Sequence, residues 1–261
     1  MKDGFQGKNA LIIASSQGLG KAIANKLAEQ GVNVMISSRE QEKLHNVKKE
    51  LELTSIGRIE YKACNIKDKN EIQDLVAATI SEFGSIDLLV NNAGGPPAGT
   101  FEEMTDEDWQ HAFELNLLSY IRITREVLPY MKKNGGKIVN IASSSVKEPI
   151  PGLILSNTFR TGIVGLTKTL AREFAPYNIL INTVAPGRFA TERLAFLEEI
   201  AAKKQGMTKI EVEETMKQTI PLGRYGEPEE FANYVSFLLS DTNSYMTGQT
   251  LLIDGGMLKS I

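Results

Sequence analysis

The fold of this chain is decided by the stretch Ala10-Leu11-Ile12-Ile13-Ala14-Ser15-Ser16-Gln17-Gly18-Leu19-Gly20. Its first five residues are apolar and predict a buried strand. Two glycines then predict a tight turn, and Ile23 and Leu27 fall at the spacing of an amphipathic helix. Gly31 stands where a helix C-cap is expected, and a second apolar run follows at 32–36. The stretch therefore predicts a β-α-β unit with parallel strands.

The same alternation of short apolar runs and amphipathic segments continues along the chain. Seven runs are predicted as strands, at residues 10–14, 32–36, 59–63, 86–90, 137–141, 179–184 and 250–253. Helical patterns separate them, including those at 69–83, 106–133, 158–174 and 228–240. This order predicts an α/β protein with one doubly wound parallel sheet and helices on both faces. We expect a single domain over residues 1–261.

One segment, residues 188–221, departs from this alternation because it has two helical apolar sets and no strand. The sets are Leu194, Leu197, Ile200 and Ala201, followed by Val212, Met216 and Ile220. In a doubly wound sheet the ligand binds beyond the carboxyl ends of the strands, where a helical insertion can close over it. We predict a substrate lid over 188–221; an extra pair of surface helices is the alternative.

Composition excludes several classes of function. The 261 residues carry a net charge of −3 without a basic run, which argues against a nucleic-acid partner. No apolar run approaches the roughly 18 residues of a membrane span. Cys64 is the only cysteine, which fits a reducing compartment, so we predict a cytoplasmic protein. We predict no metal site, because His45 and His111 have no partners at metal-ligand spacing.

The turn after the first strand is placed to bind phosphates. Gly18 and Gly20 let the backbone approach a pyrophosphate, and the helix N-terminus supplies N–H donors. After the second strand, Ser38 and Arg39 stand where an acidic residue would accept a hydrogen bond from a free ribose 2′-hydroxyl. A guanidinium there can pair with a 2′-phosphate, so we predict NADP(H) in preference to NAD(H). The alternatives are an ordinary turn and a solvated arginine.

Further motifs extend the pattern through the chain. They are Asn91-Asn92-Ala93-Gly94, Leu115-Asn116-Leu117, the run from Ile138 to Ser143, Pro186-Gly187-Arg188-Phe189-Ala190-Thr191, the run from Pro221 to Glu230, Thr247-Gly248-Gln249 and Asp254-Gly255-Gly256. With these motifs in register, the chain resembles the short-chain dehydrogenase/reductase family over essentially its whole length. It looks most like the 3-oxoacyl-[acyl-carrier-protein] reductases of that family.

The resemblance implies a Rossmann-like oxidoreductase that interconverts a small-molecule carbonyl and an alcohol with NADP(H), and that forms a homotetramer or dimer. The cofactor-binding residues that it implies are Ala14, Ser15, Ser16, Gly18, Leu19, Gly20, Ser38, Arg39, Asn65, Ile66, Asn92, Ala93, Gly94, Arg160, Pro186, Gly187 and Thr191. Asn91 is interpreted as structural, tying neighbouring strands together.

The predicted reaction centre departs from the family pattern of Asn, Ser, Tyr and Lys. Counting from Ser143 places Ser156 where the family has Tyr and Arg160 where it has Lys. No tyrosine of the chain has a lysine or arginine four residues later, so a shifted register does not explain the change. A serine hydroxyl is a much weaker acid than a tyrosine beside a lysine.

We predict catalytic roles for four residues. Ser143 polarises the carbonyl, and Arg160 holds the nicotinamide ribose and stabilises the alkoxide. Asn116 orients a water, and Ser156 at most relays a proton. The alternative is a catalytically silent dinucleotide-binding protein that keeps the fold and lacks the acid.

The glycine turn departs from the family pattern as well, because Ala14 replaces its first glycine. If the backbone has a positive φ at Ala14, the Cβ atom costs about 1 kcal/mol there.

Overall fold

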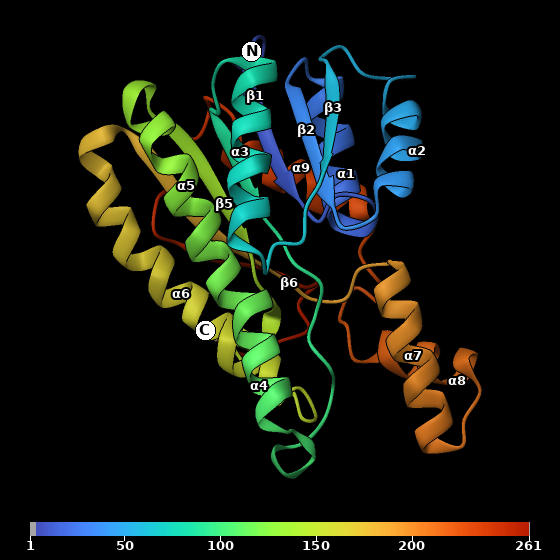
Figure 1. The fold of residues 1–261 in the computed structure, drawn as a ribbon. Helices are drawn as coiled ribbons and strands as arrows, with labels where there is room; N and C mark the ends of the chain where they lie inside the picture. Colours follow the sequence, from blue (N-terminus) through green and yellow to red (C-terminus); the bar gives the residue numbers. More distant parts are fainter. Residues whose placement is uncertain (1–3, 261) are drawn as a thin grey trace.

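The structure is a computed structural model that describes residues 4–260, so residues 1–3 and 261 of the predicted domain lie outside it. Seven parallel strands form one sheet in the order β3-β2-β1-β4-β5-β6-β7 (Figure 1). The strands are β1 (Asn9–Ile13), β2 (Asn33–Ser38), β3 (Ile59–Ala63), β4 (Leu88–Asn91), β5 (Gly136–Ile141), β6 (Ile179–Pro186) and β7 (Thr250–Ile253). The chain winds from β1 first toward one edge and then toward the other, which confirms the predicted doubly wound sheet.

Helices cover both faces of the sheet. They are α1 (Gly18–Glu29), α2 (Gln41–Leu51), α3 (Lys69–Phe83), α4 (Asp106–Phe113), α5 (Ser119–Asn134), α6 (Ile154–Phe174), α7 (Glu192–Gln205), α8 (Lys209–Gln218) and α9 (Pro228–Leu239), with the short helices η1 (Phe101–Glu103), η2 (Glu114–Leu118), η3 (Ser144–Val146) and η4 (Ala175–Tyr177). In Figure 1, α3, α5 and α6 lie in front of the sheet and α1 and α9 behind it, while α7 and α8 stand away from it. Within residues 4–260 no helix is long and apolar enough to cross a membrane.

The central strand β1 is apolar on both sides because each face of the sheet has its own core. On β1, Ala10 and Ile12 pack into the core that includes Phe231 of α9. Leu11 and Ile13 pack into the opposite core, which includes Tyr120 of α5. Burying each large side chain stabilises the fold by about 1.5 to 3 kcal/mol, so this strand anchors both layers.

The predicted helix at 106–133 does not keep one pitch. It begins after Thr105, whose hydroxyl accepts a hydrogen bond from the Asp108 N–H in a capping box. The chain then widens into a π-helix, η2, centred on Asn116, before α5 continues. The helix predicted from residue 158 also begins earlier, at Ile154. Such π-segments are frequent at functional sites, and this one positions Asn116.

A buried polar network links the middle of the sheet to the helices in front of it. The Asn91 side-chain amide donates to Asn140 Oδ1 at 2.8 Å and to Thr124 Oγ1 at 3.1 Å. Asn140 in turn donates to Thr167 Oγ1, which also accepts from the Thr183 hydroxyl, each at 2.8 Å. The network joins β4, β5 and β6 to α5 and α6, which confirms the structural interpretation of Asn91.

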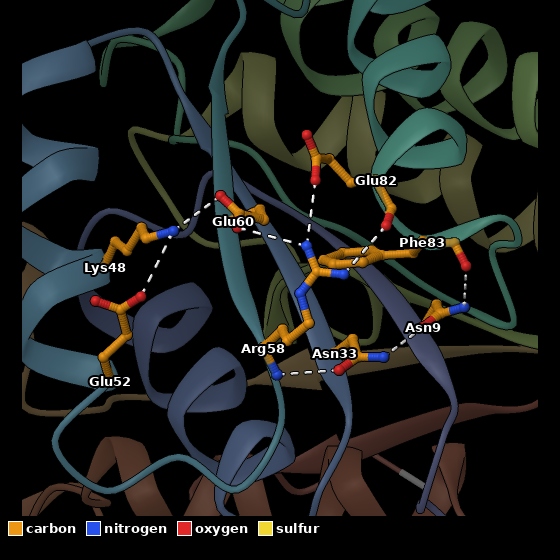
Figure 2. Close-up of polar contacts among 8 residues, drawn as sticks. All are labelled: Asn9, Asn33, Lys48, Glu52, Arg58, Glu60, Glu82 and Phe83. Atoms are coloured by element: carbon orange, nitrogen blue, oxygen red, sulfur yellow. Dashed lines mark hydrogen bonds and ion pairs between the residues drawn. The ribbon is translucent and has the colours of Figure 1, made fainter.

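A second polar cluster lies at the edge of the sheet where β1, β2 and β3 begin (Figure 2). Asn33 donates to Asn9 Oδ1 at 2.9 Å and accepts from the Arg58 N–H at 3.0 Å. The Arg58 guanidinium lies 5.4 Å from the centre of the Phe83 ring and 3.3 Å from the Glu82 carboxylate. These contacts supply hydrogen-bond partners to residues at the beginnings of β1, β2 and β3. The cleft described below lies at the other edge, where the strands end.

Replacing Asn140 with alanine tests the buried network. The change leaves the Asn91 amide and the Thr167 hydroxyl with fewer partners, so the free energy of unfolding is expected to fall by about 3 kcal/mol. Urea denaturation measures this value, and Asn134→Ala, at the exposed end of α5, is the matched control. A loss no larger than that of the control would contradict the role of the network.

Candidate active site

A cleft of about 580 Å³ lies at the carboxyl ends of the strands. Of the predicted site residues, all except Ser15, Gly20 and Asn116 line it. The order of the strands divides the cleft into two ends. Residues after β2 and β3 line one end, and residues after β5 and β6, together with α6, line the other.

The glycine turn at the middle of the cleft has the strained backbone that the sequence suggested. Ala14 has φ 51° and Gly18 has φ 55°. The carbonyl of Ala14 accepts a hydrogen bond from Asn92 Nδ2 at 3.2 Å. A Cβ atom at Gly20 would lie only 2.3 Å from that carbonyl, so only glycine lets α1 pack this closely.

The beginning of α1 faces the cleft without an internal cap. The N-cap residue Gln17 makes no side-chain capping hydrogen bond, and the first turn has no acidic residue. A negative group is favoured at such a helix terminus.

Ser15 plays a different part from its neighbours, because its hydroxyl donates to the Ile12 carbonyl at 2.8 Å and accepts from the Ser37 N–H at 2.9 Å. Ser15 therefore connects β1 with β2.

The end of the cleft beyond β2 offers a hydroxyl and a cation. Ser38 Oγ is buried and has no hydrogen-bond partner within residues 4–260. Arg39 follows it, exposed and on the cleft lining. Lys67 adds a second cation, with Nζ 3.2 Å from Nδ1 of His111. Because buried hydroxyls are normally hydrogen-bonded, Ser38 Oγ is suited to a ligand oxygen, and the 2′-phosphate of NADP(H) fits this donor set.

At the other end, the Arg160 guanidinium is buried and bound to the protein itself. Nη1 donates to the carbonyls of Ile141 and Ala142 at 3.1 and 2.9 Å, and Nη2 donates to the carbonyl of Ala93 at 3.3 Å. These carbonyls follow β4 and β5. Three of the five N–H donors of Arg160 therefore serve the backbone, and two remain.

The two predicted catalytic serines reach the same end. Ser143 Oγ accepts from the Ser145 N–H at 3.2 Å, which fixes its position at the end of β5. Ser156, in the first turn of α6, is only 8% exposed, and its hydroxyl makes no hydrogen bond to any residue within 4–260. Both side chains line the cleft beside Arg160.

Two other ionisable side chains, Tyr120 near this end and Cys64 after β3 at the opposite end, are poor proton donors. Burial raises the pKa of Tyr120 to about 12, and its hydroxyl donates to the Ile141 carbonyl at 2.8 Å. Burial also raises the pKa of Cys64 to about 12. Both groups stay protonated at neutral pH. Among the described residues no tyrosine lines the cleft, so the family acid has no displaced substitute there.

Asn116 lies behind the cleft wall rather than on it. Its amide donates to the Gly94 carbonyl at 2.8 Å, while its Oδ1 is buried without a partner in the described part of the chain. A water could satisfy that oxygen. The predicted role of Asn116 as a water-orienting residue stays a prediction.

Sequence reasoning missed several lining residues, notably Leu153, Leu197 and Arg193. Arg193 donates from Nη2 to the Pro96 carbonyl at 3.2 Å. A signal for it was present, because Arg193 is a cation two residues after Thr191, at the beginning of the predicted lid. The signal for Leu197 was its place in the apolar set of the same helix.

The cleft combines a glycine turn at a helix N-terminus with polar side chains at the carboxyl ends of adjoining strands, which is the arrangement of a dinucleotide-dependent α/β enzyme. The chain belongs to the short-chain dehydrogenase/reductase family. Residues 13–258 match the family model described as Enoyl-(Acyl carrier protein) reductase.

Relatives agree with this membership. The chain is 37% identical to the 3-oxoacyl-[acyl-carrier-protein] reductase FabG of Thermotoga maritima, over 97% of this chain and 99% of that protein. It is 36% identical to the human dehydrogenase/reductase SDR family member 4, over 98% and 89% of the two chains. The solved structure of L-sorbose reductase from Gluconobacter frateurii, complexed with NADPH and L-sorbose, is 31% identical, with a TM-score of 0.95 over the whole of both chains.

These findings show an NAD(P)-dependent oxidoreductase of the short-chain dehydrogenase/reductase type. They do not support the catalytically silent alternative.

Replacing Ala14 with glycine tests the strain in the turn. Glycine adopts a positive φ without a Cβ penalty, so Ala14→Gly is expected to raise the free energy of unfolding by about 1 kcal/mol. Urea denaturation measures the change. The matched control is Ala77→Gly on the exposed side of α3, which should have the opposite sign and lose about 0.5 to 1 kcal/mol. Equal losses in both variants would show that Ala14 is not strained.

Proposed function

We propose that this enzyme reduces a carbonyl group to an alcohol, or catalyses the reverse reaction, with NADP(H) rather than NAD(H). The observation that supports the cofactor preference is the unpartnered, buried Ser38 hydroxyl beside Arg39 at the end of β2. Glu40, the acidic residue that follows, is paired with Lys43 at 2.9 Å. The NADPH complex of the L-sorbose reductase is in keeping with this choice.

The remaining predicted cofactor residues would hold the dinucleotide along the cleft. The turn from Ala14 to Gly18 and the N-terminus of α1 would bind the diphosphate. Asn65 and Ile66 would flank the adenine, and the segment 92–94 would line the middle. Gly94 suits this position, because a Cβ atom there would project into open space that a ligand can occupy. Pro186, Gly187 and Thr191 would meet the nicotinamide.

The bound nicotinamide supplies a hydride for the carbonyl carbon. The protein must then place the carbonyl oxygen and deliver a proton to it. Ser143, held by the Ser145 N–H, would donate a hydrogen bond to that oxygen. The Ser156 hydroxyl makes no hydrogen bond to a described residue. It would connect the carbonyl oxygen with a water molecule and relay a proton from that water.

Arg160 contributes in a different way from the family lysine. Because three of its donors hold backbone carbonyls, its charge is fixed beside the reacting oxygen and stabilises an alkoxide electrostatically. The two remaining donors are available to the nicotinamide ribose. A guanidinium does not give up a proton near neutral pH, so the proton must come from water.

We further propose that residues 188–221 act as the lid and that the protein is a cytoplasmic homo-oligomer. Thr191 caps α7 by accepting from the Leu194 N–H at 3.3 Å, and it lines the cleft near Gly18. This attaches the beginning of the lid to the cofactor site.

The direct test of the function is oxidation of NADPH in the presence of ketones and 3-oxoacyl thioesters. NADPH is expected to be consumed with formation of the alcohol. Binding is measured separately by thermal shift, because a ligand that binds the native state raises the melting temperature. A folded protein that binds neither NADPH nor NADH would contradict the proposal.

Arg39→Ala tests the cofactor preference. Loss of a charged hydrogen bond to the 2′-phosphate is expected to weaken NADPH binding about tenfold or more and to leave NADH binding nearly unchanged. Fluorescence titration of each cofactor measures the two dissociation constants. Lys49→Ala removes an exposed charge from α2 and serves as control. Equal weakening of both cofactors would contradict the assignment.

The double variant Ser156→Tyr with Arg160→Lys tests whether the missing acid limits the rate. A positioned general acid contributes about 10² to 10⁴ in rate, so kcat is expected to rise about 100-fold. Steady-state kinetics at saturating NADPH measure it. Arg160→Lys alone is the control, because it removes the guanidinium contacts without adding an acid. A folded double variant no faster than this control would show that proton delivery is not limiting.

A further inference from the structure

The reaction end of the cleft has more positive charge than a neutral carbonyl substrate requires. Arg160 enters it from α6 and Arg193 from α7. Neither guanidinium forms an ion pair within residues 4–260. Glu192 is the acidic residue on the lining at this end; it is exposed and forms no ion pair with described residues. Glu40, the other acidic lining residue, lies at the opposite end and is paired with Lys43 at 2.9 Å.

The positions of the two guanidiniums are fixed by neighbouring carbonyls of one segment. Arg160 holds the carbonyl of Ala93 at 3.3 Å, and Arg193 holds that of Pro96 at 3.2 Å. Between them, Asn116 holds the carbonyl of Gly94 at 2.8 Å. Three helical elements therefore converge on residues 93–96, and they bring two cations to the same wall of the cleft.

Arg193 retains donors for a ligand. One of its five N–H groups donates to Pro96, and the other four make no hydrogen bond to a described residue, although the guanidinium lies 5.8 Å from the centre of the exposed Phe196 ring. The side chain is open to solvent on one side, so a ligand can reach it. Partial desolvation and then the positive charge of Arg160 lower the pKa of Arg193. Two cations that repel each other in this way are stabilised by an anion.

Resting on the proposed function, we propose that Arg193 forms a subsite for an anionic group, and that this group is a carboxylate of the carbonyl substrate. Arg193 supplies the hydrogen bonds, and Arg160 adds positive charge. A carboxylate matches the fork of a guanidinium, with two parallel hydrogen bonds. Leu197 lies one turn after Arg193 on α7 and, with Leu153, adds apolar surface to the lining. The substrate class is therefore an oxo acid with an apolar body.

The diphosphate of the cofactor is the other possible source of the anion. The glycine turn and the N-terminus of α1 already provide for it, and Thr191 lies next to that turn, with its Cγ2 atom 3.6 Å from a Cβ built on Gly18. Arg193 is two residues further into the lid and contacts Pro96 instead. This placement favours the substrate.

The test compares 3-oxohexanoate with its methyl ester in wild-type enzyme and Arg193→Gln. For the variant, kcat/KM for the acid is expected to fall at least about tenfold more than kcat/KM for the ester, since a charged hydrogen bond is lost. Arg193→Lys should recover part of the preference. Lys203→Gln, on the exposed side of the same helix, is the control with the same change of charge. An unchanged preference in Arg193→Gln would overturn the subsite.

Two further measurements separate the alternatives. If Arg193→Gln weakens NADPH binding as much as it weakens use of the acid, the anion is the cofactor diphosphate and the proposal is wrong. If neither compound is reduced, the proposed function fails for these substrates, and calorimetric titration of 3-oxohexanoate into the NADP⁺ complex decides the subsite. Binding to wild type that is lost in Arg193→Gln supports it; absence of binding, or equal binding, overturns it.

Discussion

The site depends on the hydrogen bonds of one buried cation, Arg160, to the backbone carbonyls that follow β4 and β5. At the end of a parallel strand the last backbone carbonyls have no hydrogen-bond partner on the neighbouring strand. A buried carbonyl without a partner lowers the stability of the fold. Arg160 satisfies those of Ala93, Ile141 and Ala142 together. It thereby connects the segments that follow two neighbouring strands, and these segments carry residues 92–94 and Ser143.

This use of the guanidinium gives a physical reason for an arginine at the position where the resemblance predicts a lysine. A planar fork can reach several carbonyls at once, which an ammonium on a flexible stem does less well. The cost is chemical, because the charge is fixed and most of its donors are occupied. The cofactor half of the cleft keeps Gly18 and Gly20 but has Ala14 in its turn, whereas the reaction half combines two serines, a structural arginine and a second arginine from α7. We infer that the family scaffold is retained and that proton delivery and substrate selection are altered.

The strain at Ala14 belongs to the same pattern. Its positive φ directs the carbonyl toward Asn92 and leaves the room that α1 needs at Gly20. A Cβ atom in this conformation reduces stability, and the buried network around Asn140 and the two apolar cores more than offset it. The unfavourable free energy of the Ala14 backbone is therefore offset by the packing and hydrogen bonds of the sheet.

The sequence by itself determined the class of fold, because alternating apolar runs and helical patterns leave few arrangements other than a parallel sheet with helices on both faces. It also located the cleft, since the glycine turn and Ser38-Arg39 follow strands that must be neighbours. Only the tertiary structure decided what the side chains do. Spacing could not show that Arg160 binds three carbonyls, that Asn116 lies in a π-helix behind the wall, or that Arg193 turns into the cleft. These facts depend on which distant segments meet, and local periodicity carries no information about that.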